Sequence, residues 1–118
     1  SYGQERIARY YRDYVNLMAR YDETMPGLIH RVIHEQLVED LEGEVRAMLR
    51  YIGVSFEDAC LRFYETGRAI RTPSSEQVRR PIFTEGLDQW RNYEAWLGPM
   101  KTVLGEVLEA YPSSPVLA

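Results

Sequence analysis

The residues that could do chemistry in this chain are gathered between positions 66 and 91. Two adjacent serines lie in this stretch with five arginines, against only three acidic side chains. The arginines are Arg68, Arg71, Arg79, Arg80 and Arg91. Because the whole chain has a formal net charge of -4, the stretch is a local basic patch in an acidic protein. Guanidinium forks and serine hydroxyls match the charge and the oxygen atoms of a phosphate monoester, so the patch favours a small anionic ligand.

A second interpretation of the same stretch stays open. Arginines in surface loops are commonly solvated or paired with neighbouring acids, and such pairs contribute little. Against this, Pro73 and Pro81 bracket the stretch and restrict its backbone, which could hold the side chains of Ser74, Ser75 and Arg79 in place at a low entropic cost. Composition alone does not decide between these two interpretations.

Other catalytic or metal-binding arrangements are scarce. His30 and His34 are spaced for one face of a strand, but no third metal ligand stands at a supportive spacing. The single Cys60 excludes an internal disulfide, and its helical spacing with Phe56 and Phe63 indicates a small buried apolar residue. The chain contains no glycine-rich phosphate loop of the form GxxxxGK[ST]. We therefore expect no metal site and no catalytic residue in this chain.

Length and composition narrow the class of protein. A chain of 118 residues with 45% apolar and 27% charged residues is one globular domain or less. It has no apolar run long enough to span a membrane and no visible leader, so we expect no membrane partner and a cytoplasmic location. An acidic total with a pI near 5.2 argues against nucleic-acid binding.

Helical periodicity dominates the pattern of apolar residues that must position the basic stretch. Residues 4–25 carry apolar side chains three or four apart, which predicts an amphipathic helix whose tyrosines face the core and which Pro26-Gly27 ends. The stripe consists of Ile7, Tyr11, Tyr14, Met18, Tyr21 and Met25. Residues 28–35 are rich in β-branched side chains and predict one buried strand. No other segment reads as a partner for that strand, so its neighbours come from a second copy or from outside the chain.

The remaining segments complete a mainly α prediction of four to five helices with one short strand. A helix is expected from about Glu42 to a stop at Gly53, and another over 56–65 with Ser55 and Asp58 as its cap. Residues 66–86 predict a loop with one helical turn at 75–78. Helical spacing returns from Leu87, breaks at Gly98-Pro99 and resumes over 100–111, before a flexible tail at 112–118. We expect residues 1–118 to form a single partial domain.

The run "SSEQVRRPI" at 74–82, followed by Trp90, resembles the C-terminal segment of sulfotransferases that use 3′-phosphoadenosine 5′-phosphosulfate (PAPS). The likeness is to tyrosylprotein sulfotransferases and to bacterial sulfotransferases fused to tetratricopeptide repeats. Upstream, "HRVIHEQLVEDLEGEVRAMLRYIGV" resembles their strand, turn and following helix, and the likeness covers roughly residues 5–101. It implies that the orphan strand belongs to the parallel sheet of an α/β fold of the P-loop type.

The resemblance implies a role for each matching position. Residues 74–83 match the loop that wraps the 3′-phosphate end of the sulfate donor. The cofactor-binding residues implied there are Ser74, Ser75, Gln77, Val78, Arg79 and Arg80. His34 stands where the family has a tyrosine beside the adenine. Gln89 stands where a basic residue is usual, so we expect Arg91 to turn in and replace it.

The resemblance also implies what this chain does not supply. In the family, the 5′-phosphosulfate loop, the catalytic base and an Arg-Ser pair lie upstream of the matching segment. The implied function is thus the 3′-phosphoadenosine-binding portion of an enzyme that moves a sulfuryl group from PAPS to an acceptor hydroxyl, with protein tyrosine as a candidate acceptor. This portion is expected to be inactive alone and to associate into a homo-oligomer by strand pairing.

One alternative function comes from a different class of protein. The chain would then be a free-standing helical interaction module that binds an acidic or phosphorylated partner through its arginine-rich loop. Its support is the content of nine tyrosines and two tryptophans, residues that are enriched at interfaces.

Overall fold

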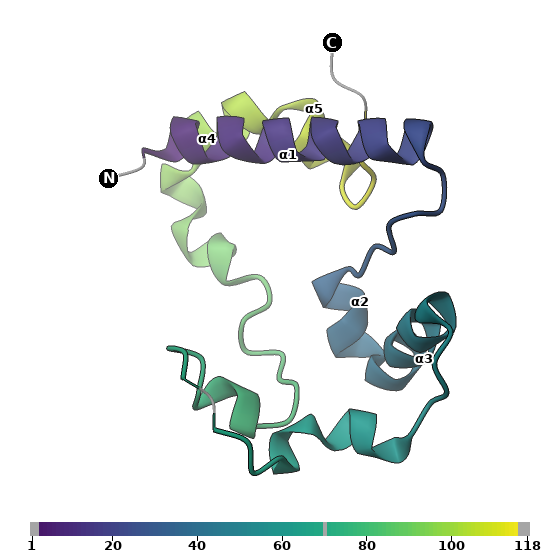
Figure 1. Cartoon of the computed structure of the whole chain (residues 1–118). Coiled ribbons are helices and arrows are strands. Elements are labelled where there is room, and N and C mark those ends of the chain that lie inside the picture. The colour runs from purple at the N-terminus through teal and green to yellow at the C-terminus, as the bar shows by residue number, and fades with distance from the viewer. Residues whose placement is uncertain (1–2, 70, 116–118) are drawn as a thin grey trace. The chain divides into compact units, whose positions relative to one another are not determined.

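The computed structural model describes residues 3–69 and 71–115, and it divides into two compact units (Figure 1). The first unit contains the residues up to Ile29 and those from Asp88 onward, and the second contains His30–Leu87. Within the described residues the chain forms five α-helices and three short 3-10 helices, and no strand. The mainly α prediction is therefore confirmed, whereas the predicted strand is wrong.

In the first unit, the long helix α1 (Gln4–Thr24) packs along α4 (Gly98–Leu104) and the short α5 (Glu106–Ala110). The buried side chains of α1 are Ala8, Val15 and Ala19, spaced three or four apart on one face. Val15 contacts the buried Val107 of α5, and Leu104 packs against this pair. The core of the unit is thus small and is built from short side chains that let the helices approach closely.

A charged side chain closes the junction between α4 and α5. Arg12 of α1 donates hydrogen bonds from Nη1 to the carbonyl oxygens of Val103 (3.2 Å) and Leu104 (3.0 Å). These carbonyls lie at the end of α4, where no further helical turn supplies N–H donors. Gly105 then turns the chain with a φ of 47°, a region that favours glycine. The helix predicted over 100–111 is for this reason two helices and not one.

The helix predicted over 4–25 is confirmed, but its buried face is not the predicted one. Ile7 and Tyr14 of the expected stripe are 48% and 50% exposed, and Tyr11 is exposed as well. The buried residues Ala8 and Val15 follow directly after these positions, so the packed face is rotated by about one residue. The prediction of core-facing tyrosines is wrong because α4 and α5 select the side chains that permit close approach rather than the bulkiest ones.

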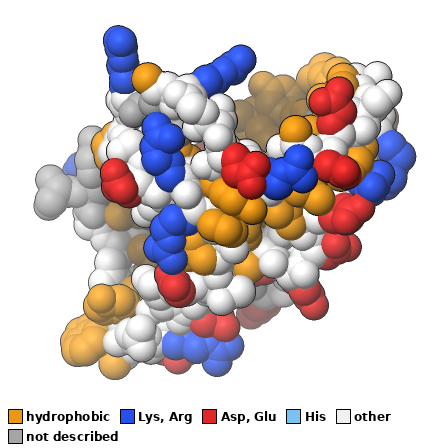
Figure 2. Space-filling model, turned by 90° about the horizontal axis from the view of Figure 1, so that it is seen from below, with side chains coloured by type: hydrophobic (Ala, Val, Ile, Leu, Met, Phe, Trp, Pro, Cys, Tyr) orange, Lys and Arg blue, Asp and Glu red, His pale blue; other side chains and the backbone are white. Residues whose placement is uncertain are grey.

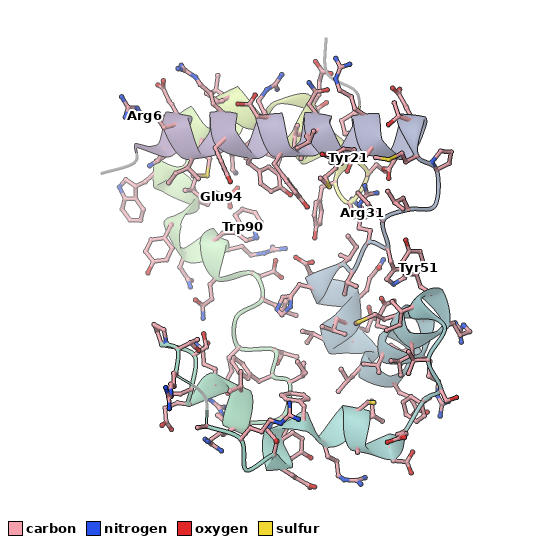
Figure 3. All side chains as sticks on the ribbon, in the orientation of Figure 1. Arg6, Tyr21, Arg31, Tyr51, Trp90 and Glu94 are labelled. Carbon is pink, nitrogen blue, oxygen red and sulfur yellow. The ribbon has the colours of Figure 1, made fainter. Side chains whose placement is uncertain are left out.

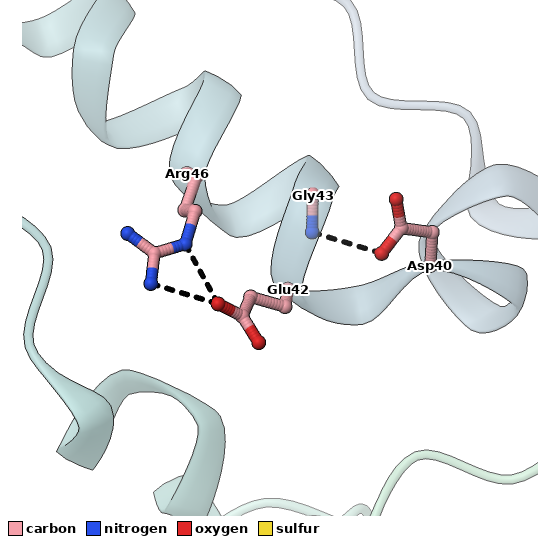
Figure 4. Close-up of polar contacts among 4 residues, drawn as sticks. All are labelled: Asp40, Glu42, Gly43 and Arg46. Atoms are coloured by element: carbon pink, nitrogen blue, oxygen red, sulfur yellow. Dashed lines mark hydrogen bonds and ion pairs between the residues drawn. The ribbon is translucent and has the colours of Figure 1, made fainter.

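In the second unit, α2 (His34–Glu39) and α3 (Leu41–Ile52) form a pair of helices joined by Asp40. The Asp40 N–H donates to the Gln36 carbonyl at 2.8 Å. The Asp40 Oδ1 accepts from the Gly43 N–H at 3.0 Å, as Figure 4 shows. One residue therefore ends α2 and caps α3. A side chain at position 43 would collide with the Asp40 carboxylate, which explains a glycine inside the first turn of α3.

The end of α3 confirms the predicted stop at Gly53. Gly53 has a φ of 77° and a ψ of 28°, and the Val54 N–H donates to the Leu49 carbonyl at 2.9 Å. The next helix differs from its prediction, because it is the 3-10 helix η1 (Asp58–Glu65) and has no side-chain cap. Ser55 is consequently not its cap. Cys60 is exposed, so the prediction of a buried cysteine is wrong.

The segment predicted as a strand is irregular up to Ile33, after which α2 begins at His34. Its apolar residues Leu28, Ile29 and Val32 are exposed. A strand exists only where a second strand pairs with its backbone, and the described residues supply none. The route to oligomers by strand pairing therefore has no strand to act through in this structure.

The loop predicted over 66–86 is present, and its helical turn is η2 (Gln77–Arg79). The helix predicted from Leu87 is the 3-10 helix η3 (Gln89–Trp96), and it ends before α4, whose first turn contains Pro99. Of the predicted tail, residues 112–115 are described without regular structure, while 116–118 lie outside the described residues.

None of the helices among the described residues combines the length and the apolar character needed to cross a membrane. Hydrophobic side chains are open on the surface and lie among side chains of both charges, as Figure 2 shows. The cytoplasmic location stays a prediction.

Replacing Asp40 with alanine tests the double role of this residue. Loss of the carboxylate leaves the Gly43 N–H without its acceptor, and we expect a loss of about 1 kcal/mol in the free energy of unfolding. The measurement is urea unfolding followed by circular dichroism. Asp40→Asn keeps an acceptor at this position and should stay within a few tenths of the wild type. Equal destabilisation by both variants would contradict the capping role.

Candidate functional site

The second unit contains a cavity of about 210 Å³ beside η2. The residues of its wall that matter for the argument are His34, Phe63, Gln77, Val78, Arg80 and Phe83. His34 comes from the first turn of α2, Phe63 from η1, and the remaining four from η2 and the loop after it. The fold therefore brings His34 to the same cavity as Gln77, Val78 and Arg80, four residues predicted from the sequence for one site.

Apolar side chains form much of this wall, and one guanidinium enters it. Phe63, Val78 and Phe83 are half-buried, whereas Arg80 is exposed. The Arg80 guanidinium carbon lies 4.7 Å from the centroid of the Phe83 ring. Its Nη2 lies 3.4 Å from both carboxylate oxygens of Glu85, which is a long and solvent-exposed contact. Such a pair contributes little to stability, so Arg80 can exchange Glu85 for a stronger anion.

The neighbouring Arg79 takes a different direction and lies outside the cavity wall. Its Nη1 donates to the Thr66 carbonyl and its Nη2 donates to the Arg68 carbonyl, each at 3.3 Å. Both hydrogen bonds connect η2 to the start of the basic loop. The predicted role of Arg79 as a cofactor ligand stays a prediction, and in this structure its donors are directed at the backbone.

The two serines contribute backbone contacts to the turn before η2. The Ser74 carbonyl accepts from the Val78 N–H at 3.1 Å, and the Ser75 N–H donates to the Thr72 carbonyl at 3.0 Å. Ser74 is exposed and Ser75 is half-buried, and neither lines the cavity. Their expected hydrogen bonds to a phosphate are untested.

Arg91 and Gln89 belong to η3 in the first unit, not to the unit that contains the cavity. The Arg91 Nε lies 3.3 Å from the Asp88 Oδ1, and its guanidinium carbon is 5.4 Å from the Trp90 ring centroid. The expectation that Arg91 replaces the missing basic residue at position 89 therefore stays a prediction.

Lys101 of α4 also lies near Trp90, which projects from η3 together with Glu94 (Figure 3). Its Nζ lies 5.2 Å from the Trp90 ring centroid and donates to the Glu94 Oε1 at 2.5 Å. The hydrogen bond from Lys101, with its positive charge, lowers the pKa of Glu94. This contact holds η3 against α4 within the first unit.

The positions of two aromatic residues in the second unit, Phe63 and His30, differ from those predicted from the sequence. Phe63 lines the cavity although sequence reasoning placed it in the core beside Cys60. The only available signal was its helical spacing, which does not identify the side that faces a cavity. His30 stacks on Tyr51 of α3, with ring centroids 5.0 Å apart and an angle of 30° between the planes. His30 therefore lies against a helix and not on a strand face with His34.

Comparison with known proteins identifies a related family for the first half of the chain. Residues 1–58 match the sequence model of the sulfotransferase family. An uncharacterized protein from Aquifex aeolicus (strain VF5) is 31% identical over 100 residues, which are 85% of this chain and 13% of that relative. No solved structure matches the chain. The chain thus contains a sulfotransferase-related portion, as the resemblance of its motifs predicted, while the tyrosylprotein and tetratricopeptide branches stay predictions.

The Lys101–Glu94 contact gives a prediction about pH. A carboxyl whose pKa is lowered by folding contributes stability above its unfolded pKa, and this contribution is lost as the pH falls through the folded pKa. In Lys101→Gln we expect the pKa of Glu94 to rise back toward its ordinary value, because the charged donor is gone. The measurement is a carboxyl-carbon titration by nuclear magnetic resonance. Lys101→Arg is the control that keeps the positive charge, and an unchanged pKa in the glutamine variant would contradict the assigned cause.

Proposed function

We propose that the cavity of the second unit binds the 3′-phosphoadenosine portion of PAPS. The chain would then be the nucleotide-binding portion of a sulfotransferase that transfers a sulfuryl group to an acceptor hydroxyl. The observation that carries the proposal is the meeting of His34 with Gln77, Val78 and Arg80 around one cavity. These four positions were assigned to the cofactor by resemblance alone, and Gln77 lies 43 positions after His34 in the sequence.

The residues of the cavity fit the chemistry of that ligand. Phe63, Val78 and Phe83 offer apolar and aromatic surface for a purine ring, and His34 offers an imidazole that can stack or form a hydrogen bond. Arg80 offers a guanidinium fork for a phosphate. The volume of about 210 Å³ is below the roughly 300 Å³ at which small-molecule sites begin, which suits a cavity that encloses only part of a nucleotide.

The cofactor would supply the activated sulfuryl group, and the residues of this chain would bind and orient its nucleotide end. Sulfuryl transfer also requires a base for the acceptor hydroxyl and positive charge beside the leaving phosphate. We assign neither role to a residue of this chain and propose that the chain alone is inactive. The acceptor proposed from the resemblance is a hydroxyl-bearing molecule, with protein tyrosine as the first candidate.

The alternative of a free-standing interaction module has less support. The match of residues 1–58 to the sulfotransferase family favours an enzyme-related portion over an independent module. The arginine loop would also serve a module best if its guanidinium groups were directed at a partner. Arg79 instead donates to two backbone carbonyls of the loop.

Calorimetry with adenosine 3′,5′-bisphosphate, using the protein at its full natural length, tests the proposal. We expect Arg80→Ala to weaken binding by about 1.5–3 kcal/mol, the range for a hydrogen bond to a charged group. Arg80→Lys should recover part of the loss, because it keeps the charge but not the fork.

A matched control comes from the same basic stretch. Arg71 is exposed and does not line the cavity, so Arg71→Ala should leave the affinity close to that of the wild type. If Arg80→Ala binds as well as the wild type, or if Arg71→Ala loses as much affinity, the basic patch is not organised around this cavity.

We also propose that the chain by itself associates with a second copy. The support is apolar surface, since Ile7, Tyr10 and Tyr14 on α1 are all exposed. The expected result is a sedimentation coefficient that rises with protein concentration, and a smaller rise for Tyr14→Lys. A monomer at every concentration tested would contradict the proposed self-association and would leave the proposed nucleotide site unaffected.

A further inference from the structure

Two adjacent arginines, Arg79 and Arg80, divide two tasks between them. Arg80 lines the cavity, whereas both terminal nitrogens of Arg79 donate to backbone carbonyls on the opposite side of the loop. Arg79 is the last residue of η2, and Arg80 follows it with an extended backbone at a φ of -116° and a ψ of 149°. The change of backbone conformation between the two residues allows their side chains to leave the chain in different directions.

The hydrogen bonds of Arg79 close a loop. The Thr66 carbonyl is 13 residues away in sequence and the Arg68 carbonyl is 11 residues away. A guanidinium presents its donors in a fixed plane, so a single side chain can donate to two carbonyls of the same loop segment at once. Without these bonds only the packing of η1 against η2 would hold the ends of the loop together, and the entropy of the open chain favours their separation.

The closed loop connects η1 to η2, and each of these elements carries a residue of the cavity wall. Thr66 follows η1 directly, and η1 carries Phe63 on one wall. Val78 lies within η2 on the other wall, and η1 packs against η2. The guanidinium of Arg79 joins the end of η2 to the residues that follow the end of η1. It therefore links the wall that carries Phe63 to the wall that carries Val78.

We infer that Arg79 is a positioning residue for the nucleotide site, and not a ligand of the phosphate. This inference rests on the proposed function of the cavity. Arg79 would set the shape of the pocket for the whole nucleotide, whereas Arg80, of these two arginines, would contact the 3′-phosphate. Two ligands can then distinguish the roles of the two arginines. The contribution of Arg80 to the affinity requires a 3′-phosphate on the ligand, whereas the contribution of Arg79 does not.

The test compares adenosine 3′,5′-bisphosphate with adenosine 5′-phosphate, by calorimetry on the protein at its full natural length. Arg79→Ala should weaken both ligands by the same factor, about tenfold, because the variant must close the loop without these two hydrogen bonds before either ligand binds. Arg80→Ala should weaken the bisphosphate by roughly ten- to a hundredfold and leave the monophosphate nearly unchanged. Arg79→Lys should restore part of the affinity for both ligands, because an ammonium can still donate to a carbonyl.

Hydrogen exchange of the protein without ligand provides a second measurement of the loop closure by Arg79. The Val78 N–H donates to the Ser74 carbonyl at 3.1 Å, and the Arg80 N–H donates to the Gln77 carbonyl at 3.2 Å. Both amides should exchange severalfold faster in Arg79→Ala and recover in Arg79→Lys, because opening of the loop frees η2. Arg80→Ala should leave the exchange rates of Val78 and of the turn before it unchanged.

The outcomes separate the inference from the proposed function. A selective loss of the bisphosphate in Arg79→Ala would make Arg79 a ligand and overturn the inference, while the nucleotide site would stand. Unchanged affinities together with unchanged exchange in Arg79→Ala would overturn it as well. If the wild-type protein binds neither nucleotide, the proposed function fails, and the exchange rates alone then report whether Arg79 braces the loop.

Discussion

Backbone groups at the ends of short helices must find hydrogen-bond partners, and this constraint explains much of the described structure. A few side chains supply those partners at critical points. Asp40 accepts from the first turn of α3, Arg12 donates to the last carbonyls of α4, and Arg79 donates to the carbonyls of the loop after η1. Only four apolar residues among those described are buried, so these hydrogen bonds at the ends of helices add to a small core.

The same constraint accounts for the segment before α2. Its β-branched residues favour an extended backbone, but a strand also needs a neighbour whose N–H and C=O groups complete the ladder. The described residues provide no such neighbour, and the backbone up to Ile33 stays irregular. The open apolar side chains of Leu28, Ile29 and Val32 are the visible consequence. That this segment pairs with strands outside the chain stays a prediction.

The candidate site shows how local chemistry and chain topology combine. The basic stretch could be recognised from its arginines and serines, but its side chains do not act as one cluster. Arg80 faces a cavity with Phe83, Arg79 faces the backbone, and Arg91 lies in the other unit. The separation has a physical basis, since consecutive residues at the end of a helix point in different directions and a guanidinium binds whichever acceptors its own direction offers.

Sequence periodicity by itself determined where the long helices α1 and α3 lie and where they stop, because Pro26-Gly27 and Gly53 act locally on the backbone. The resemblance to a family motif assigned His34, Gln77, Val78 and Arg80 to one cofactor site, and this assignment stays a prediction, although all four line one cavity. Only the tertiary structure decided that α1 buries Ala8 and Val15 rather than its tyrosines, and that Phe63 joins the cavity. Those choices depend on which elements pack against one another, and the spacing of residues within a single helix does not contain that information.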